Sequence, residues 1–153
     1  MKNQFNLKSP VQFLALGFGS GLAPKAPGTF GTLAAIPCFL LCAGLSNLYL
    51  GLLIIAMSIV GIYLCGKTAE DVGVDDHPAI VWDEFVGLFI TLYLVEITWI
   101  TVLVGFVLFR IFDILKPWPI SVVDKKIHGG FGIMFDDILA GIASFACMQL
   151  IFN

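Results

Sequence analysis

Two pairs of adjacent acidic residues stand directly in front of long apolar segments in this sequence. Asp83-Glu84 precedes one such segment, and Asp136-Asp137 precedes another. A carboxylate at the edge of apolar surroundings is costly unless a counter-charge, a metal ion or water compensates it. The fold must therefore bring compensating groups to both positions.

The composition indicates a membrane protein. Hydrophobic residues make up 59% of the 153 residues and charged residues only 12%, whereas soluble domains are about 45–50% apolar. The length suits a single domain covering residues 1–153. The formal net charge of −3 excludes nucleic acid as a partner, because phosphate backbones require a basic surface. The bilayer is therefore the expected surrounding of this chain.

The apolar segments predict a bundle of helical hairpins. Residues 33–45 and 48–66 flank a short turn and form the first hairpin. Residues 85–109 are interrupted at Glu96, so they form either one long helix or a second hairpin that returns to the same side. With two hairpins, all eight Lys and Arg residues share one face, which the positive-inside rule places in the cytoplasm. We therefore expect the second hairpin.

A loop rich in glycine and proline precedes the first apolar segment. Residues 17–32 contain five glycines and two prolines. Successive glycines can direct backbone N–H groups at an anion, and the start of the following helix favours phosphate. The candidate phosphate-binding side chains here are Lys25, Thr29 and Thr32. A flexible loop with a threonine N-cap explains the same residues equally well.

A third group of charges lies at the end of another apolar segment. Arg110, Asp113 and Lys116 are spaced three residues apart, so they share one face of a helix that Pro117 ends. A ladder of ion pairs without a catalytic role is the alternative. Helix capping explains one acid of each acidic pair but not both. Together with the two pairs, Asp113 indicates a carboxylate site for a hard divalent cation such as Mg²⁺.

These groups indicate a metal-assisted reaction at phosphate. Mg²⁺ would hold a phosphate oxygen and activate water, while Arg110, Lys116 or Lys25 would neutralise the phosphate oxygens. The sequence contains one arginine, no cysteine followed five residues later by arginine, and no Asp-x-Asp-x-Thr motif. Covalent routes through cysteine or histidine are therefore unsupported. Direct attack by water remains, and a covalent step through an aspartate also stays open.

Four segments carry a family resemblance. They are residues 17–32 (GFGSGLAPKAPGTFGT), 80–87 (IVWDEFVG), 109–120 (FRIFDILKPWPI) and 132–141 (GIMFDDILAG). In this order they resemble the motifs of the phosphatidylglycerophosphatase A family of bacterial membrane lipid phosphatases, over about residues 13–150. The resemblance implies an all-helical protein of the bacterial inner membrane. It also implies Mg²⁺-dependent removal of the terminal phosphate from phosphatidylglycerophosphate, which leaves phosphatidylglycerol.

The resemblance and the charge pattern together predict roles for ten residues. The expected metal ligands are Asp83, Glu84, Asp136 and Asp137. Asp113 is expected to be a further ligand or the base, and to act in catalysis with Arg110 and Lys116. The expected phosphate contacts are Lys25, Thr29, Thr32, Arg110 and Lys116. The expected fold is all-α, a compact multi-helix membrane bundle of helical hairpins with a Gly/Pro-rich N-terminal loop.

Two other functions compete with the phosphatase. A small membrane transporter for an anionic solute would also use helices broken by glycine. However, no inverted repeat is visible in the sequence, and the acids would repel an anion unless a metal were present. A membrane scaffold, in which the acids serve only as helix caps, is the second alternative. The sequence leaves the number of metal ions and the oligomeric state open.

Overall fold

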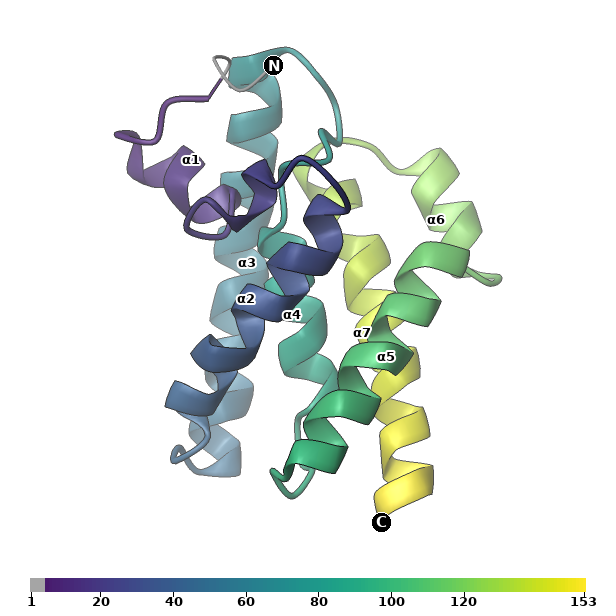
Figure 1. The fold of residues 1–153 in the computed structure, drawn as a ribbon. Helices are drawn as coiled ribbons and strands as arrows, with labels where there is room; N and C mark the ends of the chain where they lie inside the picture. Colours follow the sequence, from purple (N-terminus) through teal and green to yellow (C-terminus); the bar gives the residue numbers. More distant parts are fainter. Residues whose placement is uncertain (1–4) are drawn as a thin grey trace.

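Helices build the whole of the described chain. The computed structural model describes residues 5–153 and contains no strand in that range. The elements, drawn in Figure 1, are α1 (Pro10–Ala15), a 3₁₀ helix η2 (Ser20–Leu22), α2 (Pro27–Cys42), α3 (Asn47–Val72), α4 (Trp82–Thr91), α5 (Trp99–Leu115), α6 (Ile120–Lys126) and α7 (Gly129–Phe152). The all-α bundle predicted from the sequence is confirmed.

Two of these helices are long and apolar enough to cross a membrane. α3 has 26 residues and α7 has 24, so they extend about 36–39 Å, more than the ~30 Å hydrocarbon core. Their outer surfaces carry exposed apolar side chains, such as Ile59 on α3 and Leu150 on α7. Lipid, rather than water, is the solvent that such surfaces favour.

The second hairpin is also confirmed. α4 ends at Thr91 and α5 begins at Trp99, with Glu96 in the loop between them. Thr98 caps α5, because its side chain accepts from the backbone N–H of Thr101 while the Thr101 side chain accepts from the N–H of Thr98. Figure 1 places this loop, the α2–α3 turn and the C-terminus at the end of the bundle opposite the N-terminus.

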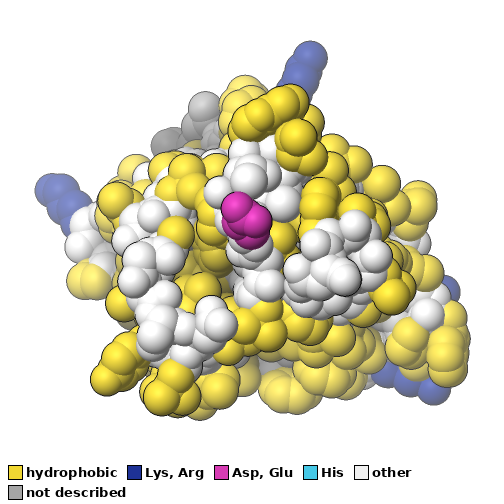
Figure 2. Space-filling model, turned by 90° about the horizontal axis from the view of Figure 1, so that it is seen from below, with side chains coloured by type: hydrophobic (Ala, Val, Ile, Leu, Met, Phe, Trp, Pro, Cys, Tyr) yellow, Lys and Arg dark blue, Asp and Glu magenta, His cyan; other side chains and the backbone are white. Residues whose placement is uncertain are grey.

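Charges are distributed unevenly between the two ends of the bundle. Figure 2 shows the end opposite the N-terminus: one acidic group stands on a largely apolar face, and basic side chains are visible only around its rim. The described basic residues lie on elements whose positions reach the other end, namely Lys8, Lys25, Lys67, Arg110, Lys116, Lys125 and Lys126. Lys2 lies outside the described residues. The arrangement agrees with basic residues gathered on a single membrane face.

Three expectations from the sequence were wrong. α3 continues to Val72, six residues past the end of the apolar segment that was expected to form it. Residues 121–137 are charged and rich in glycine and read as a polar loop in the sequence, but they are mostly helical, because they contain α6 and the start of α7. The expected anion-binding nest is closed, since the N–H groups of Gly17, Gly19 and Gly21 all donate to backbone carbonyls. Tertiary packing, rather than local helix propensity, determines the conformation of these glycine-rich segments.

α4 is the central helix of the bundle. Eight of its ten residues are buried, and it packs against α2, α3, α5 and α7. The indole N–H of Trp82 donates to the backbone oxygen of Met57 on α3, at 3.0 Å. This contact fixes the start of α4 against the middle of α3. Apart from Asp83 and Glu84 in its first turn, α4 is almost entirely apolar, as expected for a short helix that is covered on every side.

Glycines bring α4 and α7 into close contact. A Cβ atom added at Gly141 would lie 2.8 Å from the backbone oxygen of Gly87, and one added at Gly87 would lie 3.2 Å from the backbone oxygen of Asp137. Small residues allow membrane helices to approach at backbone distance. The first turn of α4 therefore lies beside the third turn of α7, and the two acidic pairs face each other.

Candidate active site

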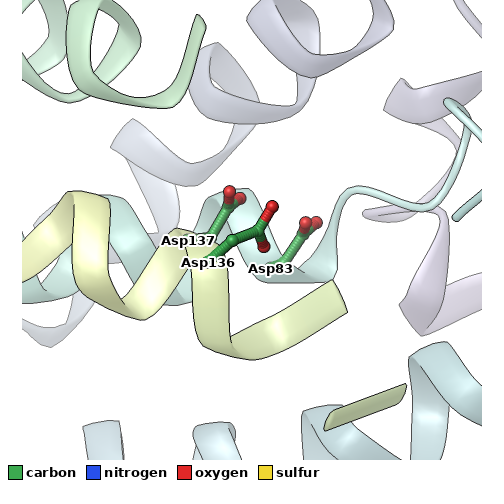
Figure 3. Close-up of side chains that lie close together, drawn as sticks. All are labelled: Asp83, Asp136 and Asp137. Atoms are coloured by element: carbon green, nitrogen blue, oxygen red, sulfur yellow. The ribbon is translucent and has the colours of Figure 1, made fainter. Parts of the chain in front are cut away.

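Five carboxylates converge at the basic end of the bundle. They come from α4, α5 and α7, and each residue is at least 92% buried: Asp83 (6% exposed), Glu84 (8%), Asp113 (8%), Asp136 (5%) and Asp137 (2%). Figure 3 shows Asp83, Asp136 and Asp137 with their carboxylates close together in the space between α4 and α7. The structure thus brings together all five acids that the sequence singled out.

Helix capping does not explain these acids. The N-cap of α4 is Val81 and makes no side-chain hydrogen bond. Asp83 lies inside the first turn, where its Oδ1 accepts from the N–H of Glu84 at 3.1 Å. Asp136 and Asp137 lie in the third turn of α7, far from its free N–H groups. The alternative of a membrane scaffold, in which the acids serve only as helix caps, is therefore disfavoured.

The carboxylates form two overlapping triads. Oxygens of Asp83, Asp136 and Asp137 lie within 4.8 Å of one another, and so do oxygens of Glu84, Asp113 and Asp137. Asp137 belongs to both triads. Oδ1 of Asp136 and Oδ2 of Asp137 are buried and have no hydrogen-bond partner among the described residues. Buried oxygens of this kind require a partner, and the all-oxygen donor set suits a hard divalent cation.

Two cations already border the cluster. Nη1 of Arg110 contacts a carboxylate oxygen of Asp113 and lies 3.4 Å from Oε2 of Glu84. Nζ of Lys116 lies 3.1 Å from Oδ2 of Asp136 and 3.5 Å from Oδ1 of Asp113. The shared helical face is confirmed for Arg110 and Asp113, whereas Lys116 is the C-cap of α5 in a left-handed conformation and reaches Asp113 from there. The ion pairs also reach across to α4 and α7, so they are more than a ladder along one helix.

The cluster remains short of positive charge. Burial opposes the charged form of Lys116, but the carboxylates of Asp136 and Asp113 outweigh it and raise the pKa of this ammonium group. Lys116 is therefore protonated at neutral pH. If all five carboxylates were ionised, three negative charges would remain uncompensated beside the two cations. Such an excess is unfavourable where water is excluded, and divalent cations or proton uptake would relieve it.

The first turn of α2 borders the same cluster. A Cβ atom at Gly28 would lie 3.0 Å from Oε1 of Glu84 and 3.2 Å from Nη1 of Arg110. Thr29 follows in this turn and is partly buried, while Lys25 is exposed on the preceding loop. The hydroxyl of Thr32 is fully buried and donates to the backbone oxygen of Gly28 at 2.8 Å. Its proton is thus already used, whereas Lys25 remains open to solvent.

Two residues near the cluster were not predicted from the sequence. Gly28 supplies the close approach just described, and a glycine in the first turn of a helix was the available signal. Asp124 on α6 lies 4.0 Å from Nζ of Lys116. Nothing in the sequence indicated that Asp124 lies near Lys116, because this contact depends on how α6 folds back after Pro117.

The fold and the cluster define an all-helical protein that has two helices long and apolar enough to cross a membrane and a buried, oxygen-lined centre at one end of its bundle. Comparison with known proteins narrows this class. The family model for phosphatidylglycerophosphatase A matches residues 13–152. The chain therefore belongs to the phosphatidylglycerophosphatase A family, and it is a phosphatase. No solved structure matches it.

Relatives from three bacteria match almost the whole chain. Phosphatidylglycerophosphatase A of Escherichia coli is 48% identical over 98% of this chain and 88% of its own length. The Haemophilus influenzae protein of the same name is 48% identical over 91% and 86%. A Bacteroides thetaiotaomicron protein, provisionally named a phosphatidylinositol-3-phosphatase, is 37% identical over 86% and 87%. An enzyme family of this kind disfavours the transporter alternative.

Proposed function

We propose that this enzyme hydrolyses the phosphate monoester of phosphatidylglycerophosphate, with Mg²⁺ as cofactor, to give phosphatidylglycerol and inorganic phosphate. The names of the two relatives at 48% identity support the substrate. One observation supports the metal above all others: Asp136 and Asp137 each bury a carboxylate oxygen that has no partner among residues 5–153. An oxygen-binding cation would satisfy both.

The proposed metal ligands divide between the two triads. Asp83, Asp136 and Asp137 would hold Mg²⁺ in the first, and Glu84 and Asp113 would complete the second with Asp137. When bound, Mg²⁺ would offset the carboxylate charge, polarise phosphate oxygens and promote ionisation of water. Oxygen ligands and the absence of His or Cys from both triads favour Mg²⁺ over zinc.

The two cations would bind the transferred phosphate. Arg110 uses Nη1 for Glu84 and Asp113, and its Nε is buried without a partner in the described chain. It therefore retains N–H donors for phosphate oxygens. Gly28 leaves open the space beside the guanidinium group that a side chain would fill. Lys116 keeps its proton and would stabilise charge on the phosphate, with Lys25 at the exposed margin.

Asp113 is the best-supported candidate for the base that removes a proton from the attacking water. It lies between Arg110 and Lys116, and both cations favour its ionised form. An ionised carboxylate can accept a proton while the neighbouring cations keep it in place. The same oxygens could instead complete the second triad, so Asp113 has two candidate roles.

The enzyme is proposed to reside in the bacterial inner membrane with its active site on the cytoplasmic side. The relatives come from bacteria. The carboxylate cluster lies at the end of the bundle where Arg110 and Lys116 contact it, and the opposite face is largely uncharged (Figure 2). Basic residues flanking membrane helices are retained in the cytoplasm. The unequal distribution of basic residues between the two ends of the bundle therefore supports an active site that opens to the cytoplasm.

Substrate choice can be measured with purified protein in detergent. Phosphate release should be compared for phosphatidylglycerophosphate, phosphatidylinositol 3-phosphate and phosphatidic acid, each with Mg²⁺. We expect phosphatidylglycerophosphate to give phosphatidylglycerol and the highest kcat/KM. The Asp137→Asn variant, purified in the same way, controls for contaminating phosphatases. Faster hydrolysis of either other lipid would contradict the proposed substrate, and no release from any of them would contradict the proposed reaction.

A further inference from the structure

An apolar groove runs between α2 and α5 on the outer surface of the bundle. It has a volume of about 520 Å³. Its walls include Leu33, Ile36 and Leu40 from α2 and Val102, Leu103 and Phe106 from α5. No charged side chain lines it within the described chain. Leu33, Leu40 and Leu103 are each 45–54% exposed, so the groove offers apolar surface directly to the bilayer.

The groove begins close to the active site. Leu33 lies five residues after Gly28, and Phe106 lies four residues before Arg110. One helical residue rises about 1.5 Å, so the groove starts about 6–8 Å from the residues that border the carboxylate cluster. The two helices that form its walls are therefore the two that carry Gly28 and Arg110.

The distance from the active site to the far end of the groove matches one leaflet of a bilayer. Trp99, the first residue of α5, lines this far end eleven residues from Arg110, which corresponds to about 16 Å. Half of a ~30 Å hydrocarbon core is about 15 Å. A lipid whose phosphate lies at the cluster would therefore extend its acyl chain along the whole groove.

A second apolar groove is formed by other helices, mainly α3, α4 and α7. It has a volume of about 420 Å³ and includes Gly51, Ile55, Ile142 and Phe145. Gly51 and Ile55 lie in the first turns of α3, at the end of that helix remote from the basic face. Neither Gly28 nor Arg110 stands on a helix that lines it. Ile142 lies five residues after Asp137 on α7, so this groove also approaches the cluster, but it has no wall on α2 or α5. It is therefore a control for the route between those two helices.

We infer that the groove between α2 and α5 binds an acyl chain of the phospholipid substrate while the lipid phosphate occupies the carboxylate cluster. This inference rests on the proposed function. The groove would position the substrate by apolar contacts that the phosphate-binding groups cannot supply. A lipid would enter sideways from the bilayer, between α2 and α5.

The inference can be tested by filling each groove with tryptophan. Leu103→Trp places a large ring in the proposed groove, and Ile55→Trp places one in the control groove. Both native side chains are more than half exposed, 54% and 58%, so neither change disturbs the core. Kinetics should be compared on long-chain phosphatidylglycerophosphate and on its water-soluble deacylated analogue, glycerophosphoglycerophosphate.

We expect Leu103→Trp to lower kcat/KM about tenfold, equivalent to 1.4 kcal/mol, on the long-chain lipid, mainly through KM. Hydrolysis of the deacylated analogue should be unchanged, and Ile55→Trp should leave both substrates unaffected. An equal loss on both substrates, or no loss on the lipid, would overturn the inference.

A crosslinking measurement separates this inference from the proposed function. A phosphatidylglycerophosphate with a photoreactive group in its acyl chain should label the α5 peptide around Leu103 in the wild-type protein. The labelling should fall in Leu103→Trp but not in Ile55→Trp. Labelling that persists without hydrolysis would count against the proposed reaction alone. Hydrolysis without labelling of α2 or α5 would count against the groove alone.

Discussion

Nζ of Lys116 lies 3.1 Å from Oδ2 of Asp136, and this contact joins the end of α5 to the third turn of α7. The same ammonium group lies 3.5 Å from Oδ1 of Asp113 on its own helix. One cation thus holds acids from two helices in place. Its raised pKa keeps it charged across the physiological range.

Replacement of Lys116 should slow the reaction. Lys116→Gln removes the charge while it keeps a side chain of similar length, so we expect kcat to fall about 10²–10³-fold, as when one group that stabilises transition-state charge is lost. Initial rates at saturating lipid provide the measurement. Lys125→Gln, at an exposed position on α6, is the matched control and should retain full activity. A kcat for Lys116→Gln within twofold of wild type would refute the role.

A methyl group at Gly28 should lower the activity of the enzyme without lowering the stability of its fold. The added Cβ would crowd Glu84 and Arg110 at 3.0 and 3.2 Å, so Gly28→Ala should lower kcat/KM severalfold. Alanine is a better helix former than glycine by up to about 1 kcal/mol, so the thermal midpoint should not decrease. Gly44→Ala, which meets no atom within 4 Å, should leave activity unchanged. Full activity of Gly28→Ala would show that this turn does not border the reacting phosphate.

His77 should make the fold sensitive to acid. Its Nδ1 accepts from the N–H of Ala79 at 3.0 Å, which requires a neutral ring nitrogen, and burial lowers the pKa of the imidazole. The unfolded chain therefore binds a proton more readily than the folded one. Stability from neutral His77 is present above the ordinary pKa of about 6.5 and is lost as the pH falls below it.

His77→Asn keeps an acceptor for this turn but cannot titrate in the same range. Thermal midpoints of both proteins should be measured between about pH 8 and pH 5. We expect a smaller decrease in the variant than in the wild type. Equal decreases would mean that another group accounts for the acid sensitivity.

Cysteine labelling should report the orientation in the membrane. Asp75→Cys and Lys125→Cys stand at the basic end of the bundle, and Glu96→Cys stands in the loop at the other end. The four native cysteines are free and should first be replaced. In intact spheroplasts an impermeant maleimide should label Glu96→Cys only, and permeabilisation should expose the other two. Labelling of Asp75→Cys before permeabilisation would reverse the proposed orientation.

Much of this architecture could be predicted from the sequence because charge is so rare in it. Each acid beside an apolar segment demanded compensation, and the placement of basic residues selected the hairpin over a single helix around Glu96. The spacing of Arg110 and Asp113 was sufficient to predict their common face, since helical geometry determines it. Lys116 reaches Asp113 from the left-handed C-cap of α5, which the spacing did not predict.

Other features depended on tertiary contacts. The start of α7 at Gly129 was hidden, because a glycine-rich segment has poor helix propensity and becomes helical through packing against α3 and α4. The approach of Gly28 to Arg110 requires α2 to lie across the end of α5, which no local pattern encodes. The apolar groove was equally invisible, since it is formed by two helices that are far apart in sequence.

The most direct test of the account combines metal binding with turnover in the Asp137→Asn variant. Asp137 belongs to both carboxylate triads, so its loss should weaken Mn²⁺ binding, followed by electron paramagnetic resonance, more than Asp83→Asn or Glu84→Gln does. Wild-type protein should release phosphate from phosphatidylglycerophosphate with Mg²⁺ and not with EDTA, and Asp137→Asn should release none. Release that persists in EDTA, or an Asp137→Asn variant that binds Mn²⁺ and turns over like the wild type, would contradict the central claim.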